Sequence, residues 1–183
     1  MRLSFGMVLM LLAATLAASC LSEEPKAYDC KAKVFFSPNG GCTEAIVSEI
    51  GKAKREILVQ AYSFTSVPIA KALVEAHKRG VDCKVILDKS QRKEKYSSAG
   101  FLANFGIETW IDEKPKIAHS KVMVIDGETI VTGSFNFTKS AEADNVENLL
   151  ILSGAELAKR YLANWQSRQK ISEPYEGKKA TDF

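Results

Sequence analysis

The sequence is poor in the residues from which metal centres are built. It holds two histidines, His77 and His119, and four cysteines among 183 residues. No two cysteines have the CxxC spacing, and no HxxxH or HExxH pattern occurs, so the signatures of zinc ribbons and of helical metalloprotease sites are missing. We therefore expect a protein without a metal or any other cofactor.

Long apolar runs are also missing. The apolar stretch over residues 3–16 is shorter than the roughly 20 residues that a membrane span needs. Arg2 precedes it and small residues follow at 17–19, which is the pattern of an export signal covering residues 1–19. Cys20 follows directly and resembles the cysteine of a bacterial lipoprotein box, although the match is imperfect. We expect an exported bacterial protein, either periplasmic or membrane-associated through a lipidated Cys20.

A strong charge excess is missing as well. The formal net charge is +3, and 46% hydrophobic with 26% charged residues is ordinary for a soluble globular chain. So small a charge does not demonstrate a nucleic-acid partner, but it does not oppose a phosphate substrate. The length fits a single domain, which we place at residues 30–170, with a polar tail at 171–183.

Short apolar runs alternate with helical patterns, which predicts an α/β architecture. Strands are expected at 34–36, 56–61, 82–87, 107–111, 117–125, 129–132 and 148–152. Helices are expected at 43–53, from Ser66 to a stop at Gly80, at 99–105 and at 155–169. The polar stretch 88–98 is predicted to be a loop.

The cysteines allow one disulfide. Cys30 and Cys42 flank a turn at 37–41, and an exporting pathway leads to an oxidising compartment. Either a bridge or two thiols fits the sequence. Cys83 is expected to be a small buried strand residue.

A predicted hairpin gathers four polar side chains. If Asp126 and Gly127 are the two central turn residues, His119 faces Ser134 across the hairpin. Side chains alternate along strands, so Lys121 shares their face, and Asn136 follows two residues after Ser134. The resulting set suits phosphoryl chemistry: an imidazole can attack phosphorus, and an ammonium, a hydroxyl and a carboxamide can hold its oxygens.

These residues carry a specific resemblance. The strings HSKVMVID (119–126) and GSFN (133–136) match the HxKxxxxD and GSxN signature of the phospholipase D superfamily. The segments YSFTS (62–66) and GSFNFTK (133–139) are similar to its small bacterial endonuclease branch, the Nuc-type nucleases. The resemblance spans about 33–168 and implies a mixed, mostly parallel sheet flanked by helices, with one motif copy per chain.

The resemblance also implies a two-step displacement. His119 would form a phosphohistidine, and Lys121, Ser134 and Asn136 would hold the phosphate oxygens. Asp126 matches the motif aspartate and so joins the implied catalytic set, although its place in a turn favours a structural role. Glu147 lies where Nuc-type enzymes have an acid that hydrogen-bonds the histidine; the alternative is an exposed glutamate at a strand start.

Counting histidines predicts an assembly. The implied chemistry uses two motif histidines, yet the chain has one motif copy, and His77 sits at a helix end where a histidine is ordinary. The second His119 would come from another chain, which predicts a homodimer with the active site on its two-fold axis.

Three functions remain open. The leading one is hydrolysis of DNA or RNA with little sequence specificity; the others are a phospholipase D acting on phospholipid head groups and a non-catalytic DNA-binding or uptake component. Basic loop residues could follow a nucleic-acid backbone; these are Lys89, Arg92, Lys93, Lys95, Lys114 and Lys116.

Overall fold

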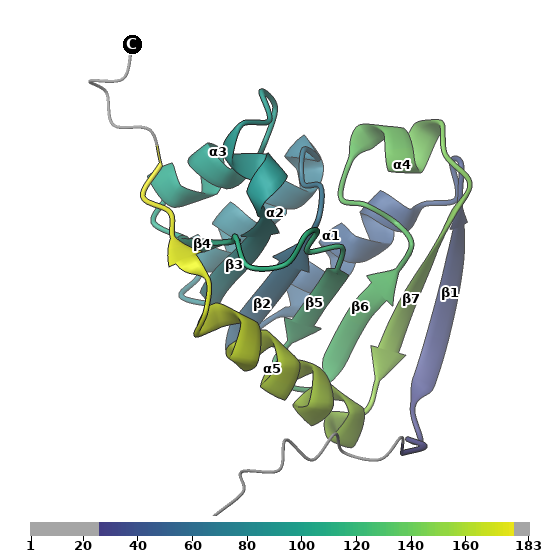
Figure 1. The fold of residues 1–183 in the computed structure, drawn as a ribbon. Coiled ribbons are helices and arrows are strands. Elements are labelled where there is room, and N and C mark those ends of the chain that lie inside the picture. Colours follow the sequence, from purple (N-terminus) through teal and green to yellow (C-terminus); the bar gives the residue numbers. More distant parts are fainter. Residues whose placement is uncertain (1–25, 178–183) are drawn as a thin grey trace, which may run out of the picture.

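A computed structural model describes residues 26–177, which form one eight-stranded sheet with helices on both faces (Figure 1). The strand order is β1-β7-β6-β5-β2-β3-β4-β8. In chain order the elements are β1 (Lys31–Ser37), α1 (Cys42–Lys52), β2 (Glu56–Ala61), α2 (Val67–Lys78), β3 (Asp82–Asp88), the 3₁₀ turn η1 (Lys89–Arg92), α3 (Ala99–Asn104), β4 (Glu108–Asp112), β5 (Lys121–Ile125), β6 (Thr129–Gly133), α4 (Lys139–Ala143), β7 (Glu147–Ser153), α5 (Ala155–Gln169) and β8 (Glu173–Pro174).

The mixed α/β fold is confirmed, but the sheet is not mostly parallel. Only β2 with β3 and β3 with β4 run parallel, whereas the other five pairings are antiparallel. Parallel neighbours need a crossover helix, and after β4 the remaining strands up to β7 are joined by loops, a hairpin and the five-residue helix α4. The antiparallel half of the sheet therefore contains the motif residues.

Two hydrophobic clusters separate the faces of the sheet. The larger one packs α1, α2 and α3 against side chains such as Val59, Val85 and Met123. The smaller one packs α5 against the opposite face, where the indole of buried Trp165 donates to the carbonyl of Val59 at 2.9 Å. Since β2 and β5 lie under helices on both faces, they form a rigid centre that carries the site.

The hairpin between β5 and β6 has a different register from the one expected. Asp126 and Gly127 do occupy the turn, with φ of 54° and 64°, and the amide of Glu128 donates to the carbonyl of Ile125 at 3.1 Å. Glu128 itself is left out of the ladder because its carbonyl accepts from Gly154. Ile125 therefore pairs with Thr129, one position away from the predicted pairing.

The disulfide alternative is wrong, because Cys30 and Cys42 are both free. Strand β1 extends back to Lys31, so Cys30 precedes one end of a seven-residue strand and Cys42 follows the other. That strand separates them by roughly 20 Å, whereas bridged cysteines have Cα atoms about 6 Å apart. Cys83 is buried in β3 as expected.

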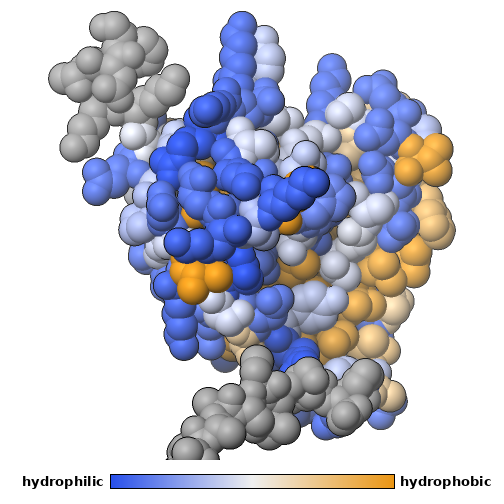
Figure 2. Space-filling view, viewed as in Figure 1, coloured by the Kyte–Doolittle hydropathy of each residue, from blue (hydrophilic) through white to orange (hydrophobic). Residues whose placement is uncertain are grey.

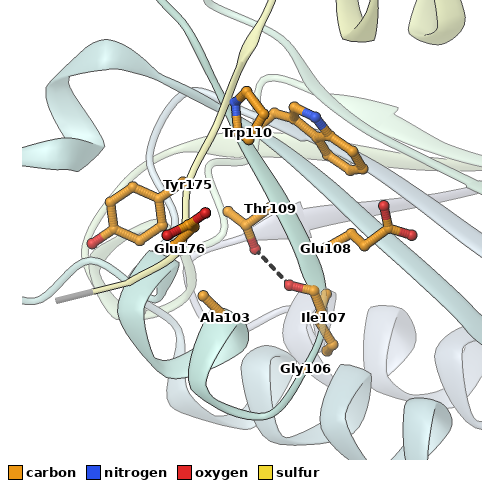
Figure 3. Close-up of a pocket in the computed structure, with 9 residues that line it drawn as sticks. Ala103, Gly106, Ile107, Glu108, Thr109, Trp110, Tyr175 and Glu176 are labelled. Carbon is orange, nitrogen blue, oxygen red and sulfur yellow. Dashed lines mark hydrogen bonds between the residues drawn. The ribbon is translucent and has the colours of Figure 1, made fainter. Parts of the chain in front are cut away.

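The end of the chain is more ordered than a polar tail implies. Glu173 and Pro174 pair with β4, and the amide of Tyr175 donates to the carbonyl of Thr109 at 2.8 Å. A pocket of about 340 Å³ lies there, and Tyr175 and Glu176 are among the residues that line it (Figure 3). The expected export signal, Cys20 and residues 178–183 lie outside the described part of the chain.

No helix within residues 26–177 is both long enough and apolar enough to cross a membrane.

Candidate active site

Four neighbouring strands bring their ends together at one end of the sheet. Lys121, the first residue of β5, pairs with Ala61, the last of β2. The neighbouring β6 runs antiparallel to β5 and ends there at Gly133, and β7 starts beside it with Glu147. The segments that carry the motif residues thus meet where the regular strands stop.

His119 and Lys121 form the centre of this cluster. The Lys121 ammonium lies 3.0 Å from Nδ1 of His119 and donates to the main-chain oxygen of His119 at 2.9 Å. His119 is exposed, whereas only 6% of the surface of Lys121 is accessible. A phosphate that touched the imidazole would therefore meet a positive charge that is fixed in place and poorly screened by water.

The ammonium of Lys121 is under two opposed influences. Burial lowers the pKa of Lys121 below its ordinary value, and the negative charge of Glu147 acts in the opposite direction. Both residues lie on the sheet face of the larger core cluster, because they alternate in register with Met123 and Leu149 respectively. Glu147 therefore helps to keep Lys121 charged.

Tyr62 belongs to the site although the hairpin argument did not include it. Its ring centroid lies 4.5 Å from that of His119, and the Lys121 ammonium lies 5.0 Å from it. The amide of Tyr62 donates to the carbonyl of Ser120 at 2.8 Å, which extends the pairing of β2 past its last strand residue. The only sequence signal for Tyr62 was its place in the YSFTS segment.

The glycine before Ser134 is required by close packing. Gly133 has φ of 143°, and a Cβ there would collide with the carbonyl of Asn148. The same carbonyl accepts from the amide of Ser134, and the hydroxyl of Ser134 accepts from the amide of Asn148 at 3.0 Å. Ser134 is thus held by β7.

Asn136 carries an unsatisfied polar atom. Phe135 and Phe137 are fully buried on either side of it, which fixes the backbone of this segment. The Oδ1 atom of Asn136 is buried with no hydrogen-bond partner. A buried acceptor without a donor costs about 1–3 kcal/mol, and a bound group that donates a hydrogen bond would recover that energy.

Glu147 does not touch the histidine in this structure. Its carboxylate accepts from the side-chain amide of Asn145 at 3.2 Å, and the described residues include no hydrogen bond between Glu147 and His119. The structure links Glu147 to the site through its charge, which acts on Lys121.

Asp126 lies at the other end of β5, about 15 Å along the strand from Lys121. Its carboxylate accepts hydrogen bonds from the amides of Lys54, Arg55 and Glu56 at 2.8 to 3.0 Å. Burial alone would raise the pKa of Asp126. These donors and the charge of Arg55 nevertheless hold that pKa below its ordinary value. The placement gives the motif aspartate a structural role in fixing the hairpin.

We expect Asp126→Asn to lower the free energy of unfolding by about 2 kcal/mol at pH 7, since hydrogen bonds to a charged group are lost. A carboxylate whose pKa is lower in the folded state stabilises above its unfolded pKa, and that stability is lost as pH falls through the folded pKa. The difference in unfolding free energy between the variant and the wild type should therefore begin to shrink below about pH 4. Urea titrations at several pH values measure this; a constant difference down to pH 3 would contradict it.

Two of the basic residues expected to follow a nucleic-acid backbone are bonded to the protein instead. Lys89 donates to the carbonyl of Pro115 at 2.9 Å, and Arg92 binds Glu113 at 2.9 Å. Both therefore brace the segment that precedes His119.

A grouping of three or more metal-binding side chains does not occur within residues 26–177.

The chain is similar to known proteins in sequence and in fold. The family model described as cardiolipin synthase, PLD-like domain, matches residues 46–168. The chain belongs to the phospholipase D superfamily. It is 43% identical over 139 residues to a phospholipase D of Rickettsia bellii, covering 76% of this chain and 69% of that protein. It is 30% identical over 122 residues to the human mitochondrial cardiolipin hydrolase, covering 67% and 47%.

Among solved structures, Nuc of Salmonella typhimurium, a phospholipase D family member, superposes with a TM-score of 0.78 and 39% identity, over 81% of this chain and all of that one. NucT of Helicobacter pylori has a TM-score of 0.75 at 24% identity, over 80% and 100%, which shows a shared fold. The expected Nuc-type branch of the phospholipase D superfamily is thereby confirmed. The protein is accordingly a hydrolase of phosphodiester bonds.

Proposed function

We propose that this phospholipase D superfamily member is a nuclease that cleaves DNA or RNA phosphodiesters with little sequence specificity. The observation that carries the proposal is the exposed imidazole of His119 within 3.0 Å of the buried Lys121 ammonium, at an open end of the sheet. The 39% identity to Nuc over all of that chain supports the nucleic-acid substrate. The imidazole supplies the nucleophile and the ammonium the positive charge, so the proposed reaction needs no metal.

In the first step an imidazole nitrogen of His119 attacks phosphorus. A nitrogen–phosphorus bond forms, and the bond from phosphorus to the leaving oxygen breaks with its electron pair. The leaving oxygen takes a proton from the imidazolium of a second copy of His119, as a general acid does. Lys121 stabilises the charge that develops on the non-bridging oxygens.

In the second step the now neutral imidazole of the second copy removes a proton from water. The oxygen of that water attacks phosphorus, and the nitrogen–phosphorus bond to His119 breaks. The products are a phosphate monoester and an enzyme with its protons restored. Ser134 and Asn136 hold the phosphate oxygens or the water, and the unpaired Oδ1 of Asn136 supports the latter. Glu147 keeps Lys121 charged, and the hydrogen bond to His119 that the resemblance implies for it stays a prediction.

The second copy of His119 requires a homodimer, and one exposed surface suits it. Val34 and Phe36 on β1 are 50% and 66% exposed, and Val146 just before β7 is 90% exposed. An apolar strip lies over β1 and β7 on the side that α5 leaves open (Figure 2). Phe36 pairs with Asn148, which binds Ser134, so the strip reaches the segment that carries Ser134.

We expect Phe36→Glu to raise the dimer dissociation constant by about 30-fold or more, since an interface aromatic contributes about 2 kcal/mol. Activity should fall at the protein concentrations where the variant is monomeric and the wild type is still a dimer. Sedimentation velocity and activity are measured on the same samples. Ile171→Glu, at an exposed apolar position of 42% outside the strip, is the matched control. A wild type that is active as a monomer would contradict the dimer.

The substrate is tested with labelled single-stranded DNA, duplex DNA and RNA, each with and without EDTA. We expect cleavage that survives EDTA and is absent in His119→Gln. Loss of all cleavage in EDTA, restored by a divalent ion, would contradict the mechanism. DNA binding without cleavage by the wild type would favour a binding or uptake component.

Phospholipid hydrolysis is the second candidate, because the Rickettsia relative is named a phospholipase D and the human relative a cardiolipin hydrolase. Vesicles of phosphatidylcholine or cardiolipin, assayed beside the nucleic acids, decide between the two. Release of a head group faster than any nucleic acid is cut would overturn the nuclease proposal.

We also propose that the protein is exported and loses residues 1–19. Intact-mass measurement of the cell-expressed protein distinguishes loss of residues 1–19 alone from loss with a lipid on Cys20. Either outcome supports export, and an uncleaved chain contradicts it.

A further inference from the structure

The segment that carries His119 has no helix or strand of its own. Residues 113–120, between β4 and β5, are irregular in structure. A catalytic histidine on such a segment must be held by contacts from elsewhere, because orientation of the reacting groups within a fraction of an ångström decides the rate.

Besides the contacts of Tyr62 and Lys121 described above, three holding contacts come from one short stretch at the end of β3. The carboxylate of Asp88 accepts from the amide of Ala118, the residue before His119, at 2.7 Å. Lys89 donates to the carbonyl of Pro115 and Arg92 to the carboxylate of Glu113, each at 2.9 Å. Three side chains within five residues thus form hydrogen bonds to three positions of segment 113–120.

Asp88 is the innermost of the three. Only 3% of its surface is accessible, and its other carboxylate oxygen accepts from the amide of Ser90 at 2.9 Å. Burial alone would raise its pKa, yet the donors at Ala118 and Ser90 hold the pKa of Asp88 below its ordinary value. The carboxylate is thus ionised, buried and directed at the backbone beside His119.

We propose that Asp88 is a positioning residue for the reaction: its carboxylate, through the Ala118 amide, sets where the His119 imidazole stands relative to Lys121 and the phosphate. This inference rests on the proposed role of His119 as nucleophile. Asp88 lies on β3, which is separated from β5 by β2. Its hydrogen bond to Ala118 therefore spans the end of β2 to reach the segment that carries His119.

The test uses Asp88→Asn in the full-length protein, with Asp82→Asn at the exposed start of the same strand as the control. The asparagine side chain keeps one acceptor oxygen, but its NH₂ group is a donor and would face the backbone N–H of either Ser90 or Ala118, which is also a donor. With bis(4-nitrophenyl) phosphate, a minimal diester, we expect kcat to fall about 10- to 100-fold while KM changes less than twofold. Asp82→Asn should match the wild type.

A second measurement does not depend on activity. The chain has two histidines, so the imidazole Cε1–H NMR spectrum has one signal for His119 and one for His77, assigned with His119→Gln. In Asp88→Asn the His119 signal should shift or broaden while that of His77 stays in place.

An unchanged His119 signal, or a kcat within twofold of the wild type in folded Asp88→Asn, overturns the inference. If that variant does not fold, Lys89→Gln with Arg92→Gln loosens the outer two contacts, and the same two readouts apply with the same criteria. If the wild type hydrolyses no nucleic acid, the proposed function fails while the NMR result still decides the role of Asp88.

Discussion

Replacing His119 by glutamine is expected to lower kcat/KM by about 10⁴-fold or more, because removal of a catalytic nucleophile costs on this scale in other hydrolases. Glutamine keeps a polar side chain of similar reach but has no nucleophilic nitrogen. His119 is exposed, so its loss should leave the fold intact. The assay is initial-rate cleavage of single-stranded DNA, with circular dichroism as the check on folding.

His77→Gln is the matched control, since His77 is the other histidine of the chain and lies in the last turn of α2. Its activity should stay near that of the wild type. Equal losses in the two variants would show that the His119 effect is a general loss of structure.

Mixed dimers test whether both copies of His119 act at one site. A dimer of one wild-type and one His119→Gln chain has a nucleophile but no partner imidazole, so it should have far less than half of the wild-type activity. A mixed dimer with half of the wild-type activity would instead indicate two independent sites.

Replacing Lys121 by methionine is expected to lower kcat by about 10²- to 10³-fold, the usual effect of removing one group that stabilises developing charge. Methionine fills similar space, and burying it costs less than burying an ammonium. Since only 6% of the surface of Lys121 is accessible, the variant should be at least as stable as the wild type. Single-turnover cleavage and thermal unfolding measure the two effects.

Lys52→Met, at an exposed position in α1, controls for the loss of one positive charge. A fall in activity with a matching fall in stability for Lys121→Met would contradict a catalytic role. Activity within threefold of the wild type would contradict it more directly.

The motif and the core elements were predictable because their signals are local. The apolar run 56–61 coincides with β2, Ser66 precedes α2, and Asp126 with Gly127 forms the turn. Each of these follows from side-chain burial or from a positive φ at two adjacent positions. The proximity of His119 and Lys121 was expected from a strand over 117–125, but β5 begins only at Lys121 and His119 lies in the irregular segment before it.

The rest depends on contacts between distant segments. The register of the hairpin depends on Gly154, 26 residues after Glu128, whose amide donates to the Glu128 carbonyl, and it shifts the β5–β6 pairing by one position from the expected one. Likewise the Cys30 thiol is far from Cys42 because β1 lengthens by pairing with β7 along seven residues. Neither partner can be recognised from the local sequence.

The hydrogen bond from the Ala118 amide to Asp88 is a contact of this kind at the functional site, and the sequence alone does not predict it. In the sequence Asp88 only begins a polar loop, and 30 residues separate it from Ala118. Its value as a hydrogen-bond acceptor appears only when β3 and the segment before β5 end side by side.

The central claim is that His119 becomes covalently bound to phosphorus. The direct measurement is a millisecond alkaline quench of the wild-type protein mixed with single-stranded DNA, followed by peptide mass spectrometry. We predict a nucleotide or phosphate adduct on the peptide that contains His119, formed and lost at the rate of turnover and absent in His119→Gln. Turnover without any adduct, or an adduct on another residue, would contradict the account.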